Sequence, residues 1–385
     1  MNSLAPKRRR LLTIGHSYAI ALNRRLANEM AVAGAGEWEV TCVAPKFLQG
    51  DLRPVHLERT DSEACRLEPV PLRFSRRIHA MWYGRRLRQI LREPWDVIHC
   101  WQEPYIAVGG QIARWSPRSA KLVYATFQNI NKKYPPPFNL IENYSMRRAS
   151  GWIAFGQTIE ENLAERPGYV GLPHRVIPLG VDLEKFKPDA TARRRIQAKL
   201  DWPVTDVPVV GYLGRFVPEK GIQLLMRSLE AVNVPWRALF VGSGPLESEL
   251  REWAAKTGGR ARIVTGVTHD DVPDQVNAMD LLCAPSQTAP NWREQLGRML
   301  IEAFACGVPV IASDSGEIPR VVGDAGLIVG ESDGAGWVDA LSRMLSQPDL
   351  RAEYAAKGRA RAETEFAWPL IARRHLDFFD ELLSK

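Results

Sequence analysis

Residues 281–314, LLCAPSQTAPNWREQLGRMLIEAFACGVPVIASD, contain the pattern that decides the fold class. The run LLCAPS predicts a strand that ends near Pro285. RMLIEAFACG predicts a helix that stops at Gly307, and Pro309 follows as a second stop signal. VPVIASD then predicts another strand. A strand, a helix and a strand in this order are typical of a parallel α/β sheet.

The same alternation extends through the rest of the chain. In the first half, the strand-like runs LLTIG, WEVTCVAP, WDVIHCW and KLVYATF alternate with helical patterns such as NRRLANEMAVAG and TIEENLAER. Residues 175–189, RVIPLGVDLEKFKPD, break this rhythm with two prolines and mixed charge, so we interpret them as a connection. The alternation restarts at VPVVGYLGR. We therefore predict two α/β domains of similar size, each with a parallel sheet covered on both faces.

Length and composition agree with this division. A chain of 385 residues is too long for one ordinary core and suits two domains of ~150 to 200 residues. No apolar run reaches the ~18 residues of a membrane span, and no signal peptide is indicated, so we expect a cytoplasmic protein. The five cysteines form no C-x-x-C pair. We expect buried free thiols rather than a zinc site or a disulfide framework.

The charge is unevenly placed along the chain. Residues 1–187 carry 28 Lys and Arg against 17 Asp and Glu, a net +11, whereas the remainder carries 23 against 27, a net −4. A basic first half suggests an anionic partner such as a phosphorylated acceptor, an acidic membrane surface or nucleic acid. A merely solvated basic surface remains an equal alternative.

Two glutamates flank the start of the helix in the opening stretch. Glu294 lies before the predicted helix, and Glu302 lies about a turn and a half inside it. Free backbone amides and the helix dipole favour an anion at this N-terminus, and Gly297 lets the backbone approach it closely. We predict that the two carboxylates bind hydroxyls on either side of a clamped diphosphate.

A second predicted phosphate-binding element is the loop GYLGRFVPEKG. This loop follows a predicted strand and places Arg215 and Lys220 five residues apart, next to Gly214. Two cations at the carboxyl end of a parallel strand suit a diphosphate. VGSGPLESEL adds Gly242 after the next strand, but it lacks the third glycine of a dinucleotide fingerprint.

Together these stretches resemble the retaining glycosyltransferases of family 4, which have the GT-B fold and the E-x7-E motif. The resemblance covers the second half: GYLGRFVPEKG, LFVGSGPLESEL, IVTGVTHDDVP, LLCAPSQ and EQLGRMLIEAFACGVPVIASD stand in the family's order. It implies two Rossmann-like, doubly wound domains facing a central cleft. The implied bounds are an acceptor-side domain at residues 1–178, a nucleotide-sugar domain at 179–365, and a helix at 366–385 that packs on the first domain.

The resemblance also implies roles for individual residues. Glu294, Arg215 and Lys220 are the expected catalytic residues, with Glu294 on the sugar hydroxyls and the two cations on the diphosphate. Glu302 is expected to contact the ribose, and Gly266 and Val267 the base. The remaining expected donor-binding residues are Gly214, Gly242, Pro285, Leu296, Gly297 and Arg298.

Departures from the family concentrate in the first half. The loop after the first strand reads GHSYAIALN instead of carrying a glycine pair. Phe127 and Gln128 stand where many members have a histidine. The candidate acceptor-side residues are His16, Ser17 and Gln128.

The function implied is transfer of a hexosyl unit from a UDP- or GDP-sugar to a hydroxyl of a glycan or lipid-linked acceptor, with retention at the anomeric carbon. The chain has no D-x-D triplet, so we expect no metal and no other cofactor. The alternatives are sugar-nucleotide epimerisation or α-glucan synthesis on the same fold, or a basic nucleic-acid-binding protein. No nucleic-acid module is present, so we expect no nucleic-acid partner.

Residues 72–102 mix arginines with Trp82, Tyr83 and Trp95. This composition suits either peripheral attachment to the anionic inner face of a membrane or an ordinary helix face.

Overall fold

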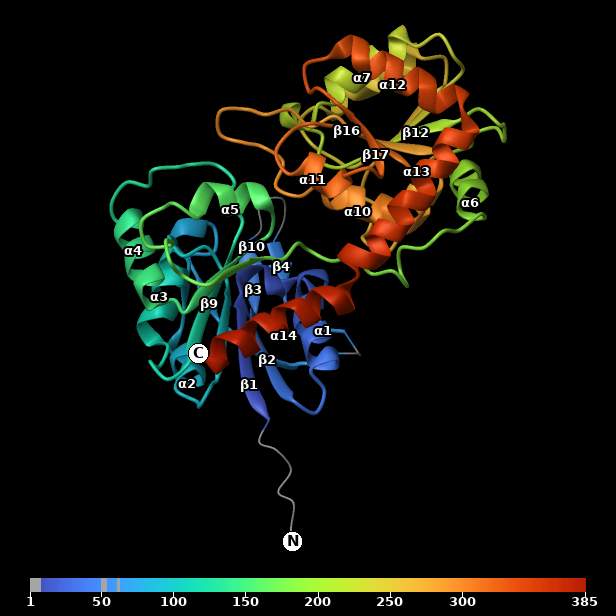
Figure 1. Ribbon diagram of the computed structural model, residues 1–385. Helices are drawn as coiled ribbons and strands as arrows, with labels where there is room; N and C mark the ends of the chain where they lie inside the picture. Colours follow the sequence, from blue (N-terminus) through green and yellow to red (C-terminus); the bar gives the residue numbers. More distant parts are fainter. Residues whose placement is uncertain (1–7, 50–53, 61–62) are drawn as a thin grey trace. The chain divides into compact units, whose positions relative to one another are not determined.

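The computed structural model describes residues 8–49, 54–60 and 63–385. The chain forms two compact units. Unit 1 comprises the chain up to Pro178 together with Trp368–Lys385, and unit 2 comprises Leu179–Ala367 (Figure 1). Both units are built around a parallel sheet.

The sheet of unit 1 has seven strands among the described residues, in the order β11-β10-β9-β8-β1-β2-β5, all parallel. Its central strands β1 and β8 are almost wholly buried, as expected when helices cover both faces. The strands are β1 (Arg9–Gly15), β2 (Trp38–Pro45), β5 (Arg66–Val70), β8 (Val97–Trp101), β9 (Lys121–Thr126), β10 (Gly151–Ala154) and β11 (His174–Val176).

Helices and two small antiparallel pairs complete unit 1. The C-terminal helix α14 packs beside α1 (Figure 1), and its Phe379 ring contacts Trp38 of β2 and His99 of β8. The helices are α1 (Arg25–Ala33), α2 (Arg85–Leu91), α3 (Ala107–Trp115), α4 (Phe138–Arg148), α5 (Gln157–Leu163) and α14 (Trp368–Ser384). The small pairs are β3 (Phe47–Gln49) with β4 (Pro54–His56) and β6 (Leu72–Arg73) with β7 (Trp82–Tyr83).

The sheet of unit 2 has six parallel strands among the described residues, in the order β14-β13-β12-β15-β16-β17. In Figure 1 the helices α7 and α12 lie on one side of this sheet and α10 and α13 on the other. The strands are β12 (Val209–Leu213), β13 (Arg237–Val241), β14 (Ala261–Val264), β15 (Leu281–Ala284), β16 (Val310–Ser313) and β17 (Gly326–Val329). The helices are α6 (Ala192–Lys199), α7 (Ile222–Ala231), α8 (Glu247–Lys256), α9 (Val272–Asn277), α10 (Arg298–Ala305), α11 (Ile318–Val322), α12 (Gly334–Ser346) and α13 (Pro348–Arg361).

In both sheets the strand order reverses beside the first strand of the unit. The chain of unit 1 runs from β1 to β2 and β5 on one side, then to β8, β9 and β10 on the other. Unit 2 does the same around β12, with β13 and β14 on one side and β15 on the other. Each unit is therefore doubly wound, as predicted, and ligands of such sheets bind outside the strand ends at this switch point.

Two interpretations of the sequence need correction. Residues 175 and 176 are not part of a connection, because β11 (His174–Val176) pairs with β10 at the edge of the sheet of unit 1. Residues 72–102 are not one helix face, because only α2 is α-helical there and Tyr83 and Trp95 are buried.

The five cysteines are free and buried, as predicted. Among the described residues, no helix combines the length and apolar character needed to cross a bilayer.

Candidate functional site

The loops after β12 and β15 meet at the switch point of unit 2. The Gln287 amide of the second loop donates to the Glu219 carbonyl of the first at 2.8 Å. Gly221 lies against Pro285 so closely that a Cβ there would stand 1.8 Å from the Pro285 carbonyl oxygen, and its φ is +70°. Only glycine can adopt this backbone conformation at such a short distance without strain. Gly221 therefore allows the two loops to pack in direct contact.

An ion pair links the side chains of these loops. The Lys220 ammonium, 13% exposed, pairs with the Glu294 carboxylate, 9% exposed. The Ser286 hydroxyl, buried at the end of β15, donates to the same carboxylate at 3.0 Å. The Lys220 Nζ also lies 5.1 Å from the centre of the Trp292 ring. Glu294 is therefore held in one orientation by groups from both loops.

The backbone of Glu294 is fixed from a third loop, the one after β16. Its carbonyl accepts a hydrogen bond from the Glu317 amide at 3.1 Å. A Cβ at Gly316 would lie 2.1 Å from that carbonyl oxygen. Ser286, Trp292 and Gly316 were not predicted as site residues. Only the place of Ser286 directly after a predicted strand would have been a signal.

Helix α10 begins at Arg298, as the sequence predicts, and Gly297 is its N-cap with φ +78°. A Cβ on Gly297 would lie 2.8 Å from the Leu300 side chain, so this glycine is needed for the turn itself. The buried side chain of Leu296 precedes it. The first amides of α10 and the positive end of its dipole follow Glu294 directly, and a Cβ on Gly297 would lie 3.8 Å from the Glu294 side chain. This arrangement suits an anion at this end of the sheet.

Glu302 is buried within α10 and has no hydrogen bond or ion pair among the described residues. Burial raises the pKa of Glu302 to about 7, and the nearby charges of Arg298 and Lys185 oppose this rise. Burial, together with the same two cations, lowers the pKa of His269 to about 4. A buried carboxyl without a partner is costly, so this position suits a ligand that offers hydroxyl donors.

The other predicted donor residues lie in neighbouring loops at the same edge of the sheet. Arg215 is exposed, and its guanidinium makes no ion pair or hydrogen bond within the described residues. A Cβ at Gly242 would stand 1.8 Å from the Gly214 carbonyl oxygen, so the loops after β12 and β13 touch. Gly266, with φ +71°, and Val267 follow the edge strand β14.

The candidate acceptor-side residues lie in unit 1. His16 and Ser17 follow β1, and the Nδ1 atom of His16 lies 2.5 Å from the Oε1 atom of Gln102, which follows β8. This pair spans the switch point of unit 1. Gln102 is buried, and its Nε2 atom has no partner among the described residues. Gln102 was not predicted, because a single glutamine after a strand carries no sequence signal.

Gln128 is engaged inside unit 1. Its amide nitrogen donates to Glu103 at 3.0 Å, and its amide oxygen accepts from Arg166 at 2.9 Å. Arg166 also pairs with Glu142 at 2.9 Å, and burial raises the pKa of Glu103. Gln128 therefore joins partly buried charged groups. The ring of Phe127, next to it in sequence, stacks on that of Phe155 with 3.8 Å between ring centroids.

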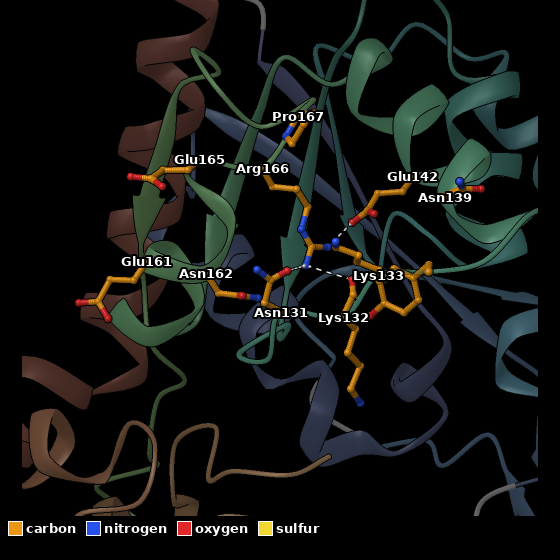
Figure 2. A pocket seen from close by; sticks show the side chains of 11 residues that line it. Asn131, Lys132, Lys133, Asn139, Glu142, Glu161, Asn162, Glu165, Arg166 and Pro167 are labelled. Atoms are coloured by element: carbon orange, nitrogen blue, oxygen red, sulfur yellow. Dashed lines mark hydrogen bonds and ion pairs between the residues drawn. The ribbon is translucent and has the colours of Figure 1, made fainter. Parts of the chain in front are cut away.

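This network lies beside a polar pocket of about 650 Å³. Figure 2 shows the guanidinium of Arg166 at its centre, directed at Glu142, Asn131 and Lys132, while Glu161 and Glu165 point away. The remaining lining residues are Lys133, Tyr134, Asn139, Asn162 and Pro167. The amides and charged groups of this lining suit a polyhydroxylated ligand.

Comparison with known proteins agrees with the division of the chain into two units. Residues 22–185 match the model of Glycosyltransferase Family 4, and residues 193–361 match that of Glycosyl transferases group 1. The D-inositol 3-phosphate glycosyltransferase of Corynebacterium jeikeium is 30% identical over 383 residues, which cover 93% of this chain and 85% of that relative. The chain belongs to the glycosyltransferases that join these two domains.

Two further similarities are partial or concern the fold alone. A GDP-mannose-dependent monoacylated alpha-(1-6)-phosphatidylinositol monomannoside mannosyltransferase of Corynebacterium glutamicum is 34% identical over 51% of this chain and 54% of its own length. The chain thus spans about half the length of several curated relatives that it matches. The sucrose-phosphate synthase of Thermosynechococcus elongatus superposes with a TM-score of 0.74 at 22% identity, covering 98% of this chain and 100% of that one. The fold of this glycosyltransferase is GT-B, as predicted.

Among the described residues, no group of three or more His, Cys, Asp or Glu side chains is placed to hold a metal ion.

Proposed function

We propose that this glycosyltransferase moves a hexosyl unit from a UDP- or GDP-sugar to a hydroxyl of a glycan or lipid-linked acceptor, with retention at the anomeric carbon. The observation that carries the proposal is the arrangement at the switch point of unit 2. There Lys220, Glu294 and the start of α10 come together, with Glu302 buried inside the same helix. Lipid- and glycan-modifying relatives support glycoconjugate biosynthesis as the setting.

The donor is bound by charge and by hydroxyl contacts. Arg215, Lys220 and the amides of α10 bind the diphosphate, because charge-assisted contacts suit its many acceptor oxygens. Glu294 accepts hydrogen bonds from sugar hydroxyls in the orientation that Ser286 and Lys220 set. Glu302 accepts from the ribose hydroxyls, and the loop at Gly266 and Val267 contacts the base.

The transfer step breaks the bond between the anomeric carbon and the diphosphate oxygen. The electron pair stays on the leaving diphosphate, where Arg215, Lys220 and the helix N-terminus stabilise the added charge. The acceptor oxygen bonds to the same face of the anomeric carbon, and its proton passes to the leaving phosphate oxygen. This step uses no metal. The acceptor binds unit 1, through His16 and Ser17 and through the polar pocket beside Gln128.

Thermal stabilisation by a panel of UDP- and GDP-sugars tests donor binding, since a ligand at ~100 times its Kd adds ~2.7 kcal/mol. The configuration of the product, measured by NMR, tests retention, and an assay in excess EDTA tests independence of metal. We expect stabilisation by one base series, a product with the donor's anomeric configuration and full activity in EDTA. Stabilisation by no nucleotide sugar would contradict the donor site, and an inverted product would contradict the mechanism.

A further inference from the structure

Residues 69–92 of unit 1 contain seven arginines and no Asp or Glu. Their centre is a two-stranded hairpin in which β6 pairs with β7, with Leu72 opposite Tyr83 and Arg73 opposite Trp82. We call residues 72–83 the basic hairpin. Its connecting residues 74–81 are exposed apart from Ser75 and Met81.

The base of the hairpin is firmly attached to unit 1. Tyr83 is fully buried, and its backbone exchanges two hydrogen bonds with the Gln111 side chain, at 2.9 and 2.8 Å. Met81 is 1% exposed. The hairpin is therefore presented by a fixed base rather than by a free loop.

Three large apolar side chains of the hairpin are nevertheless exposed. Phe74 is 67% exposed, Ile78 is 50% and Trp82 is 40%. Phe74 also has φ 58°, a left-handed conformation that is unfavourable for a bulky residue. This cost is not offset by packing of the Phe74 side chain, which points to a contact made outside the chain.

The arginines around these side chains are exposed as well. The side chains of Arg73, Arg76, Arg77, Arg85 and Arg88 form no ion pair or hydrogen bond within the described residues. Arg86 is bound, at 3.1 Å from Glu68. Five cations without partners beside three exposed apolar groups form a surface that is both basic and hydrophobic.

We propose that the basic hairpin docks unit 1 onto an anionic lipid bilayer. Phe74, Ile78 and Trp82 enter the boundary between headgroups and acyl chains, while the arginines contact lipid phosphates. This binding does not depend on glycosyl transfer and goes beyond it. A nucleic acid would satisfy the arginines, but it stacks its bases on aromatic planes and gains nothing from Ile78.

Sedimentation of the full chain with vesicles tests the proposal. Vesicles of phosphatidylcholine alone are compared with vesicles that also contain phosphatidylglycerol, at low and high salt. We expect binding to the anionic vesicles that weakens with salt. Each Arg near the surface contributes ~1 kcal/mol, so Arg76→Gln/Arg77→Gln should weaken this binding about 30-fold. Phe74→Ser/Ile78→Ser should weaken it roughly tenfold or more, because the inserted apolar area is lost.

Matched controls remove the same chemistry elsewhere on unit 1. Arg118→Gln/Arg147→Gln removes two exposed arginines that have no partner, and Val32→Ser/Val170→Ser removes two apolar side chains that are 62% and 64% exposed. Both controls should bind vesicles like the wild type. All variants should keep their stabilisation by the nucleotide sugar, since unit 2 is unchanged.

Equal binding to neutral and anionic vesicles, or binding to neither, overturns the proposal. Equal losses in the hairpin variants and their controls would also overturn it, because they would show a general charge effect. Retention of random-sequence RNA on a filter, with no vesicle binding, would assign the hairpin to nucleic acid instead.

Discussion

At the switch point of unit 2, loops from two strands hold the buried ion pair of Lys220 with Glu294. At the same place in unit 1, the Nδ1 atom of His16 lies 2.5 Å from the Oε1 atom of Gln102. One architecture thus presents a buried ion pair in one unit and a histidine–amide contact in the other. The first arrangement suits a diphosphate and the second suits a hydroxyl group.

The net charge of the two halves of the sequence contrasts with the charges at the two switch points. The first half of the sequence is basic at +11, and the second half is acidic at −4. The cations that serve the proposed donor site are therefore few and specifically placed, whereas those of unit 1 lie largely on its surface. Net charge alone would assign the anionic ligand to unit 1, whereas the proposed diphosphate site lies in unit 2.

Lys220→Ala should have the largest effect, because it removes the proposed diphosphate contact and breaks the buried ion pair with Glu294. A charge-assisted contact contributes ~1.5 to 3 kcal/mol, so kcat/KM should fall about 10- to 150-fold. Steady-state kinetics measure this loss. Arg227→Ala, an exposed cation on α7, is the control and should leave kcat/KM unchanged. An unchanged rate in Lys220→Ala would end the functional contrast between the two switch points.

The two glutamates should fail in different ways. Glu294→Gln should lower kcat about tenfold or more and leave the affinity for free nucleoside diphosphate unchanged, because in the proposed site Glu294 contacts the sugar and not the nucleotide. Glu302→Gln should weaken that affinity about tenfold, because it loses a charge-assisted contact with the ribose. Calorimetric titration with the nucleoside diphosphate separates them. Equal losses of affinity in both variants would contradict this assignment.

The raised pKa of Glu302 predicts that nucleotide binding depends on pH. Only the ionised carboxylate accepts both ribose hydroxyl hydrogens. Because the pKa is about 7 in the free protein, affinity should fall up to about tenfold per pH unit below that value. The diphosphate titrates too, so the comparison is between the wild type and Glu302→Gln, whose affinity should depend less on pH. Parallel pH profiles for both proteins would contradict it.

The same shift has an opposite sign for the stability of the unliganded protein. The pKa of Glu302 rises from its usual 4.5 to about 7 on folding, so the protonated form is favoured in the folded state. The wild type should therefore lose unfolding free energy relative to Glu302→Gln as the pH rises from about 4.5 through 7. Chemical denaturation at several pH values measures this difference. A constant difference would contradict the shifted pKa.

Local patterns predicted the two parallel α/β domains and the elements around Glu294 and Glu302, and the family resemblance added the doubly wound strand order. Strands such as β12 and β15 are short apolar runs, and α10 has a glycine at its start and another just beyond its end. The short strand β11 was missed because its pattern, HRV, is polar and its pairing with β10 is decided by the sheet.

Contacts between loops that are distant in sequence could not be predicted from local patterns. The close approach of Gly316 to the Glu294 carbonyl joins loops after different strands, and no residue spacing signals it. The basic hairpin shows the same limit from another side. The composition of residues 72–102 suited a membrane surface or an ordinary helix face, and only the structure separates the buried Tyr83 and Trp95 from the exposed Phe74 and Ile78.

Gln102→Ala should have the smallest effect of these variants. It tests the role of the switch point of unit 1. The variant removes one hydrogen bond to His16, and such a bond contributes ~0.5 to 1.5 kcal/mol. We expect the KM for the acceptor to rise about two- to tenfold, because His16 loses one of the contacts that orient its ring. The affinity for the nucleotide sugar should stay unchanged, since Gln102 lies in unit 1 and the proposed donor site lies in unit 2. Kinetics with varied acceptor and calorimetry with the donor measure the two quantities. A rise in the donor Kd with an unchanged acceptor KM would assign the switch point of unit 1 to the donor and remove the division of labour between the units.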